Sequence, residues 1–405
     1  MPRLSFSLLA AFILILLNFS CQSSSNSGET ESSEKNELMA EAAEETNEMD
    51  GQPEMTLFAI RVDKLRMRKE AGQKGELVTY MDEGEFVTGM GEVSDFVDTL
   101  ELRGMYYREP YYKVVSSRPA QETGYIFGGG LQPVYIGPAE GAPDLAKLAA
   151  LTAFLKSLPA SELTSGSQAW EYLRKNFPNE TPVVSDAAFI LFRNFMEKME
   201  MEGMFYNLVE QVEWQESDYN QIYAGKFNMA KNPITASLAR NGFALGIAEG
   251  SVFPVADKKA QADFFKNRVT SPMKQYIELD FADFERPAMD DGGITVPLED
   301  FAERAIAWEK FETANPRFLL SGIVHEHAKW MGLTVLGGVD NTPVANYETE
   351  EISEEFEKVW NSILAKYPET RLAGHIRDLQ GIVKKSGDKY TSEARVYVDR
   401  LWEQE

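Results

Sequence analysis

The stretch YYKVVSSRPAQETGYIF, residues 111–127, determines what fold the first part of this chain is expected to have. Its two ends, YYKVV and GYIF, are rich in aromatic and β-branched residues, which favour strands, and polar residues typical of turns separate them. Similar short runs precede it at residues 56–62, 77–80 and 86–87. Closely spaced short strands are typical of a small barrel, so we expect residues 55–137 to form a small all-β module.

These residues resemble the bacterial SH3 (SH3b) domain. That family opens with an Arg-flanked strand, here LRMR at 65–68, and continues through a strand and a turn, here LVTYMDEGEFV at 77–87. It closes with an aromatic-Lys-Val strand, here YKVV at 112–115, and a Gly-aromatic-Ile strand, here GYI at 124–126. The resemblance implies an SH3-like β-barrel in which residues 93–110 form an enlarged central loop.

Tyrosines gather in this module, and Tyr106, Tyr107, Tyr112 and Tyr125 are its candidate ligand-binding residues. Tyrosine suits a ligand groove because its ring packs while its hydroxyl stays in water. Neighbouring residues of a strand face opposite sides of the sheet, so Tyr111 and Tyr112 cannot both line one groove. A ligand groove and a role in closing the barrel core both remain open for these tyrosines.

The N-terminus predicts where the protein is located. After Arg3, residues 8–17 (LLAAFILILL) form an unbroken apolar run. A helix of that length spans about 15 Å, half of a hydrocarbon core, so the run is typical of a signal peptide. Ser20 and Cys21 follow it and resemble the lipobox of bacterial lipoproteins, with residues 1–21 as leader and lipobox. The resemblance implies acylation of Cys21 and lipid anchoring to the bacterial cell envelope, periplasmic or at the cell surface. The alternative is an ordinary secreted protein with a stray cysteine.

Charge and composition narrow the function classes. The formal net charge is −24, so a nucleic acid is excluded as an expected partner. Residues 22–54 hold ten acidic residues and one lysine, which predicts a disordered acidic tether. One cysteine and three histidines cannot build a disulfide framework, a zinc ribbon or an iron–sulfur cluster. We therefore expect neither a metal site nor a cofactor.

Residues 145–405 are expected to form a larger all-α domain of helix hairpins. Pro143-Asp144 is expected to start one helix, and Ser185-Asp186 another. Apolar residues at helical spacing predict the further helices at 298–314, 317–336, 354–366, 370–385 and 391–405.

A faint repeat runs through this half, in which a tryptophan stands eight residues before a proline. Its copies are WEYLRKNFP at 170–178, WEKFETANP at 308–316 and WNSILAKYP at 360–368. Each tryptophan is expected to pack inwards on a helix that ends just before its proline. The last copy resembles the junction between the helices of tetratricopeptide-type pairs, which makes a concave peptide-binding surface one further possibility.

The sharpest catalytic candidate is His325-Glu326-His327, because a His-x-His pair occurs in lysostaphin-like peptidases and SH3b modules often accompany cell-wall hydrolases. No histidine precedes His325 to complete that site. On a helix, side chains two positions apart also point about 200° apart, which prevents a shared metal. We therefore expect no catalytic residues and no enzyme.

Three loop segments also place polar residues in apolar or glycine-rich surroundings: Glu249-Gly250, Asp290-Asp291, and GGVDNTP at 337–343. We expect mainly structural roles for them. The sequence thus predicts a non-catalytic envelope lipoprotein that binds an extracytoplasmic ligand or protein, with the membrane, peptidoglycan or an envelope protein as partners. The alternative is a cell-wall hydrolase that uses carboxylates or the His325-Glu326-His327 segment.

Overall fold

The computed structural model describes residues 54–404, which divide after Pro143 into two compact units. We call residues 54–143 the sheet unit and residues 144–404 the helical unit. The predictions for the leader, for Cys21 and for the tether up to residue 53 lie outside the described residues. None of the helices in the described part of the chain is both long and apolar enough to cross a bilayer.

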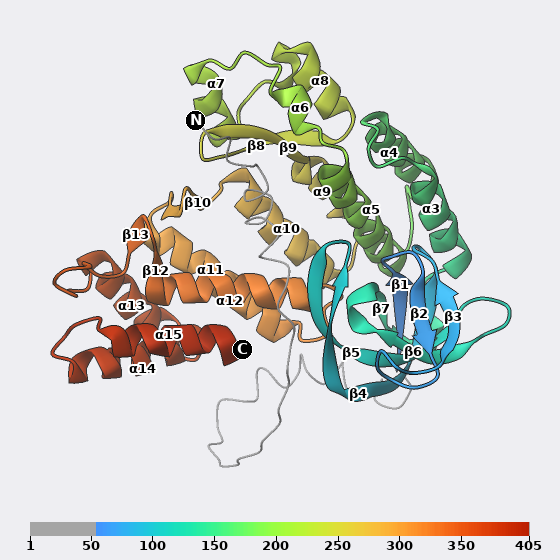
Figure 1. The fold of residues 1–405 in the computed structure, drawn as a ribbon. Helices are drawn as coiled ribbons and strands as arrows, with labels where there is room; N and C mark the ends of the chain where they lie inside the picture. Colours follow the sequence, from blue (N-terminus) through green and yellow to red (C-terminus); the bar gives the residue numbers. More distant parts are fainter. Residues whose placement is uncertain (1–53, 405) are drawn as a thin grey trace, which may run out of the picture. The chain divides into compact units, whose positions relative to one another are not determined.

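The sheet unit is built on one seven-stranded antiparallel sheet, in which the strand order is β3-β2-β6-β5-β4-β1-β7 (Figure 1). Its strands are β1 (Glu54–Ile60), β2 (Leu65–Arg68), β3 (Leu77–Met81), β4 (Phe86–Leu102), β5 (Met105–Ser116), β6 (Thr123–Phe127) and β7 (Leu131–Pro138).

The prediction of a small SH3-like barrel is wrong, because the sheet is large and its longest strands occupy the predicted central loop. Strands β4 and β5 are 17 and 12 residues long, and their pairing continues to Leu102 opposite Met105. The two residues between them, Arg103 and Gly104, have φ of 53° and 81°. Positive φ at both positions is the geometry of a tight hairpin turn, so residues 93–110 extend the sheet instead of looping out of it.

One side of the sheet unit carries a compact apolar core. Its central members, Met67, Val87, Val114 and Ile126, are fully buried and come from four different strands. Strand alternation places these side chains on one face, which explains why short runs separated in sequence build a single core. Tyr112 packs against the same cluster.

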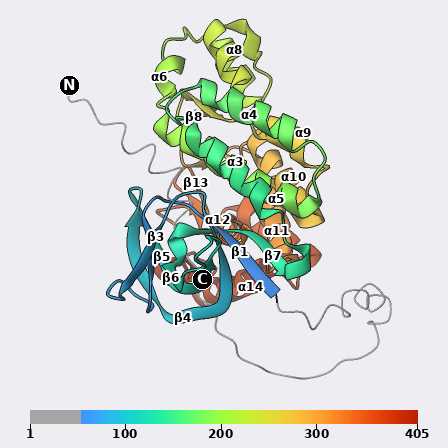
Figure 2. The same ribbon diagram turned by 90° about the vertical axis from the view of Figure 1, so that its right-hand side faces the viewer.

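The helical unit contains thirteen α-helices among its described residues, and α3 and α5 lie side by side in it (Figure 2). The helices are α3 (Leu145–Ser157), α4 (Thr164–Asn176), α5 (Pro182–Glu202), α6 (Tyr206–Val209), α7 (Glu216–Tyr223), α8 (Pro233–Arg240), α9 (Lys258–Phe265), α10 (Ser271–Glu285), α11 (Leu298–Ala314), α12 (Ser321–Gly337), α13 (Glu354–Lys366), α14 (Arg371–Lys385) and α15 (Ser392–Gln404).

One of the two predicted helix starts is confirmed and the other is wrong. The Asp144 side chain accepts hydrogen bonds from the first backbone N–H groups of α3, as a cap should. Helix α5 instead begins at Pro182, because proline is preorganised for a first helical position. Asp186 therefore lies inside α5, where its carboxylate accepts from the backbone N–H of Thr270 at 2.9 Å and from its hydroxyl at 2.6 Å. It ties α5 to the start of α10.

The tryptophan–proline repeat behaves as predicted. Trp170, Trp308 and Trp360 are each at most 3% exposed. The helices that carry them, α4, α11 and α13, end two residues before the respective proline. The repeat therefore marks the ends of three helices that pack inwards through a large aromatic ring.

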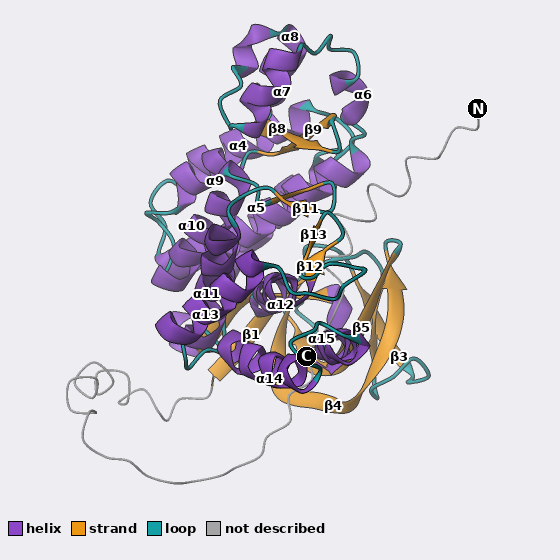
Figure 3. Cartoon of the chain, turned by 90° about the vertical axis from the view of Figure 1, so that its left-hand side faces the viewer, coloured by secondary structure: helices purple, strands orange, loops and turns teal. Residues whose placement is uncertain are grey.

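The prediction of an all-α second domain is wrong, since this unit also contains three small antiparallel hairpins (Figure 3). In the largest, Glu249 and Gly250 turn the chain with φ of 49° and 71°. The hairpin strands are β8 (Phe243–Ala248) with β9 (Ser251–Ala256), β10 (Met289–Asp290) with β11 (Gly293–Ile294), and β12 (Gly338–Val339) with β13 (Thr342–Pro343).

Candidate ligand-binding groove

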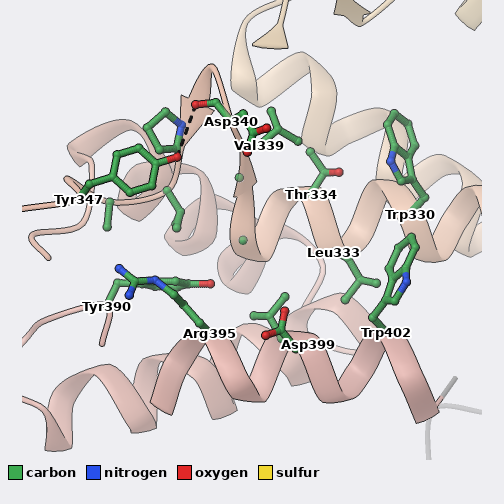
Figure 4. A pocket seen from close by; sticks show the side chains of 16 residues that line it. Trp330, Leu333, Thr334, Val339, Asp340, Tyr347, Tyr390, Arg395, Asp399 and Trp402 are labelled. Carbon is green, nitrogen blue, oxygen red and sulfur yellow. Dashed lines mark hydrogen bonds between the residues drawn. The ribbon is translucent and has the colours of Figure 1, made fainter. Parts of the chain in front are cut away.

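A groove of about 460 Å³ lies within the helical unit, between α12, α15 and the chain that follows α12 (Figure 4). Its volume is within the usual range for small-molecule sites. The β12–β13 hairpin and the segment that continues to Tyr347 form one wall, and the two helices form the others.

The two helices present matching faces to the groove. On each, the lining residues stand at positions i, i+3, i+4 and i+7, the spacing that brings side chains onto one face of a helix. These residues are Trp330, Leu333, Thr334 and Gly337 on α12, and Arg395, Val398, Asp399 and Trp402 on α15.

Aromatic rings occupy both ends of the groove. Trp330 and Trp402 lie at one end, and Tyr347 and Tyr390 lie at the other (Figure 4). Trp402 is 38% exposed and Tyr347 is 68% exposed, whereas Tyr390 is buried. Two of the four rings therefore keep a large surface in contact with solvent that a ligand can cover.

Charged groups lie between the aromatic ends. Arg395 and Asp399 are one turn apart on α15, and both side chains are exposed. A guanidinium nitrogen of Arg395 lies 3.9 Å from a carboxylate oxygen of Glu350, a separation at which the guanidinium retains donors for another partner. Asp340 adds a second exposed carboxylate from the turn of the β12–β13 hairpin.

Tyr390 contributes a buried phenol that stays protonated. Burial raises the pKa of Tyr390, the charge of Arg395 opposes that rise, and the charge of Asp399 adds to it. Its hydroxyl lies 3.4 Å from the carbonyl oxygen of Leu336 at the end of α12. Tyr390 therefore joins the segment before α15 to α12 and helps to hold the two walls of the groove in place.

Trp402 is held from one side by a buried cation. The Nζ atom of Lys329 lies 5.7 Å from the centre of the Trp402 ring, and Lys329 is only 5% exposed. A cation near an aromatic ring is attracted by the ring's electrons, more strongly where water is excluded. This contact fixes the last turn of α15 against α12 at the tryptophan end.

The tyrosines predicted to bind a ligand do not converge in the sheet unit. Tyr112 stands opposite the buried Ile126, and Tyr125 stands opposite Lys113. Residues directly opposite each other share a face, so Tyr112 and Tyr125 lie on opposite faces of the sheet. Tyr112 packs on the core, while the Tyr125 hydroxyl donates to Glu92.

Tyr106 and Tyr107 lie near the tip of the β4–β5 hairpin, where they also point to opposite faces. Tyr106 is 64% exposed and stands opposite Glu101. Tyr107 is half-buried, with the guanidinium carbon of Arg61 5.6 Å from its ring centre. The four candidates thus lie in different surroundings and are divided between the two faces of the sheet.

The histidines of the His325-Glu326-His327 segment contact different carboxylates. Nδ1 of His325 lies 2.5 Å from a carboxylate oxygen of Glu312 on α11, and Nε2 of His327 lies 3.1 Å from Asp283 on α10. The separation follows from the helical period of α12. Within residues 54–404, no three His, Cys, Asp or Glu side chains are grouped closely enough to hold a metal ion.

Asp283 also interacts with two residues of α11. Asp283 also accepts from the indole N–H of Trp308 at 2.7 Å and lies 3.2 Å from Arg304. Burial alone would raise the pKa of Asp283, but the hydrogen bond and charge of His327, with Trp308 and Arg304, lower it overall. Such a carboxylate stays ionised, and this cluster joins α10, α11 and α12.

The groove residues on α12 and α15 were not predicted as a site from the sequence. Their spacing is visible within the predicted helices 317–336 and 391–405, but nothing local shows that these two faces meet. Asp340, by contrast, belongs to the GGVDNTP loop that sequence alone had singled out.

Comparison of the chain with protein families, with curated proteins and with solved structures gives no match. The function must therefore be argued from the groove and the sequence.

Proposed function

We propose that this protein is a non-catalytic binding protein, lipid-anchored to the bacterial cell envelope through Cys21, and that the groove between α12 and α15 is its ligand site. One observation carries the proposal: exposed aromatic faces and charged groups from two helices and a loop converge in one groove. A preformed concave site with a few polar groups among apolar ones is the usual form of a ligand site.

The side chains of the groove favour binding over catalysis. Its described lining contains no His, Cys, Ser, Lys or Glu. Acyl transfer and related reactions usually need a nucleophile next to a base. Asp340 and Asp399 are the groove's only carboxylates among these lining residues, so they are the pair on which a hydrolytic alternative would depend.

The envelope assignment rests on the sequence around Cys21. A charged start, an apolar run and a lone cysteine after Ser20 resemble the lipoprotein signal. Cys21→Ser in the full chain, expressed in a Gram-negative host, is expected to abolish incorporation of labelled fatty acid and to move the protein out of the membrane fraction. Equal labelling of both forms would contradict the lipid anchor.

The groove is tested by retention of the unacylated Cys21→Ser chain on purified cell-wall sacculi and on washed envelope membranes, because the lipid would otherwise hold the protein on membranes by itself. Trp402→Ala is expected to lower retention about tenfold, because an aromatic contact of about 1.4 kcal/mol corresponds to a tenfold change in affinity. The matched control is Tyr106→Ala, which removes an exposed ring of the sheet unit. Equal retention of this chain with and without Trp402→Ala would overturn the groove as the site, and release of soluble wall fragments would overturn the non-catalytic assignment.

A further inference from the structure

Resting on the proposed function, we infer that the groove binds a linear, uncharged oligosaccharide, which lies along it with sugar rings against the aromatic faces at both ends.

The arrangement of the rings fits an extended ligand. The tryptophan pair and the tyrosine pair lie at opposite ends, with the charged residues of α15 between them (Figure 4). A sugar ring has an apolar C–H face and a polar edge of hydroxyls. The C–H face packs on the electron-rich face of Trp or Tyr, and the edge stays available for hydrogen bonds. Rings at both ends match a chain of several sugars better than a single compact molecule.

The charge of the groove argues against an anionic ligand. Arg395 and Asp399 have opposite signs and lie one turn apart, and Asp340 leaves the lining with one excess negative charge. An anionic ligand would be repelled by this lining and by a chain of net charge −24. Hydroxyl groups both donate and accept, so a neutral sugar can pair with the guanidinium and with both carboxylates.

The walls of the groove do not suit a peptide that binds by adding a strand to a sheet. Peptides that bind by strand addition need an exposed strand edge, whose backbone groups form the ladder. Here two walls are helices, and the only strands that line the groove, β12 and β13, are two residues long and pair with each other. The segment beyond them is engaged as well, since Ala345 pairs with Ile352.

The experiment is a titration of the purified full chain with β-1,4-linked N-acetylglucosamine oligomers, from the disaccharide to the hexasaccharide. Binding is followed by tryptophan fluorescence and by calorimetry. Affinity is expected to rise with chain length until the oligomer spans both aromatic ends and then to level off. It is expected to change little with salt, since no net charge is neutralised.

Three variants test the geometry. Trp402→Ala and Tyr347→Ala are each expected to weaken binding of the hexasaccharide about tenfold. Trp402→Phe keeps an aromatic face and is expected to retain most of the affinity, which separates loss of the platform from loss of the fold. Tyr106→Ala, in the sheet unit, is the control and is expected to bind as wild type does.

The possible failures are distinguishable. If no oligosaccharide binds, but retention on sacculi or membranes still depends on Trp402, the glycan inference falls and the proposed function stands. A proline-rich peptide that binds with the same dependence on Trp402 and Tyr347, where oligosaccharides do not bind, also overturns the glycan. If neither oligosaccharide binding nor retention responds to Trp402→Ala, both the inference and the proposed groove fall.

Discussion

Tyr111 in the sheet unit and Tyr347 in the helical unit show two opposite uses of the same side chain. Tyr111 is 3% exposed, donates its hydroxyl to Asp98 at 2.8 Å and lies edge-on to Phe127. Tyr347 is mostly exposed, and its hydroxyl lies 3.4 Å from the carbonyl oxygen of Asp340. Strand alternation divides the sheet unit's tyrosines between two faces. The groove of the helical unit instead takes its aromatic residues from α12, from α15 and from the two segments that hold Tyr347 and Tyr390. Composition alone therefore did not locate the site.

The largest expected effect is that of Tyr111→Ala. Removing a buried aromatic ring leaves a cavity, and such changes lower the free energy of unfolding by about 3–5 kcal/mol. Urea unfolding of the full chain measures the loss, with circular dichroism to follow both units and tryptophan fluorescence to follow the helical unit, which holds all six tryptophans. Trp402→Ala in parallel is expected to cost less than half as much, since that ring is partly in water. Equal losses of unfolding free energy would contradict this comparison, because they would show that the Trp402 ring stabilises the fold as much as a core residue does.

The buried carboxyls of the two units are expected to respond to pH in different windows. Burial raises the pKa of Asp186 to about 6, although the hydrogen bonds from Thr270 oppose that rise. Its folded-state pKa lies above the unfolded value of 3.8, so its stabilising contribution is fully present only below pH 3.8. That contribution is lost as the pH rises through about 6. Between these limits, wild type is expected to lose up to about 3 kcal/mol relative to Asp186→Asn.

The measurement is the difference in unfolding free energy between wild type and Asp186→Asn at several pH values from 4 to 7. Glu109→Gln is the counterpart in the sheet unit. Burial raises the pKa of Glu109 to about 7, and Arg61 opposes the rise, so its window runs from 4.5 to about 7. A loss of wild-type stability relative to Asp186→Asn as the pH falls would contradict the sign derived for Asp186.

The sequence predicted the helices and strands whose ends are marked locally and missed the others. The predicted strands at 65–68 and 77–80 correspond to β2 and β3, whereas α7 to α10 were not predicted. Helices α11 and α13 have the predicted bounds, 298–314 and 354–366, because periodic apolar residues and a following proline define both ends. The β4–β5 and β8–β9 hairpins were missed. Their turns use Arg103-Gly104 and Glu249-Gly250, whereas the familiar signal for such a turn is Asn-Gly or Asp-Gly.

The groove could be predicted only in part. Each of its two helices carried the i, i+3, i+4, i+7 pattern in sequence, but the meeting of α12 with α15 joins segments about 60 residues apart. Which helical faces meet depends on the packing of every helix between them. The same reason explains why Asp186, placed by sequence at the start of its own helix, instead accepts hydrogen bonds from Thr270, the residue that caps α10.

A smaller loss of stability is expected when alanine replaces glycine in the turns of the β4–β5 and β8–β9 hairpins. The loss should be similar in the two units. Gly104→Ala and Gly250→Ala force a Cβ onto a residue with positive φ, although neither Cβ would meet an atom within 4 Å. Each is expected to cost about 1 kcal/mol of unfolding free energy from backbone strain alone. The control is Gly381→Ala, an exposed position inside α14 with equal space, which should stabilise by about 0.5–1 kcal/mol. A stabilising effect of alanine at either turn would show that the turn geometry described here is wrong.

The smallest effect on stability is expected for alanine at two exposed tyrosines, only one of which lines the groove. Tyr106 and Tyr347 are 64% and 68% exposed, so replacing either by alanine should change the unfolding free energy by less than about 0.5 kcal/mol. Only Tyr347 shares a groove with Trp330 and Trp402, so only Tyr347→Ala should weaken ligand binding. Parallel unfolding and binding measurements on the two variants test this directly. If Tyr106→Ala weakened binding and Tyr347→Ala did not, the site would belong to the sheet unit, where the sequence first placed it.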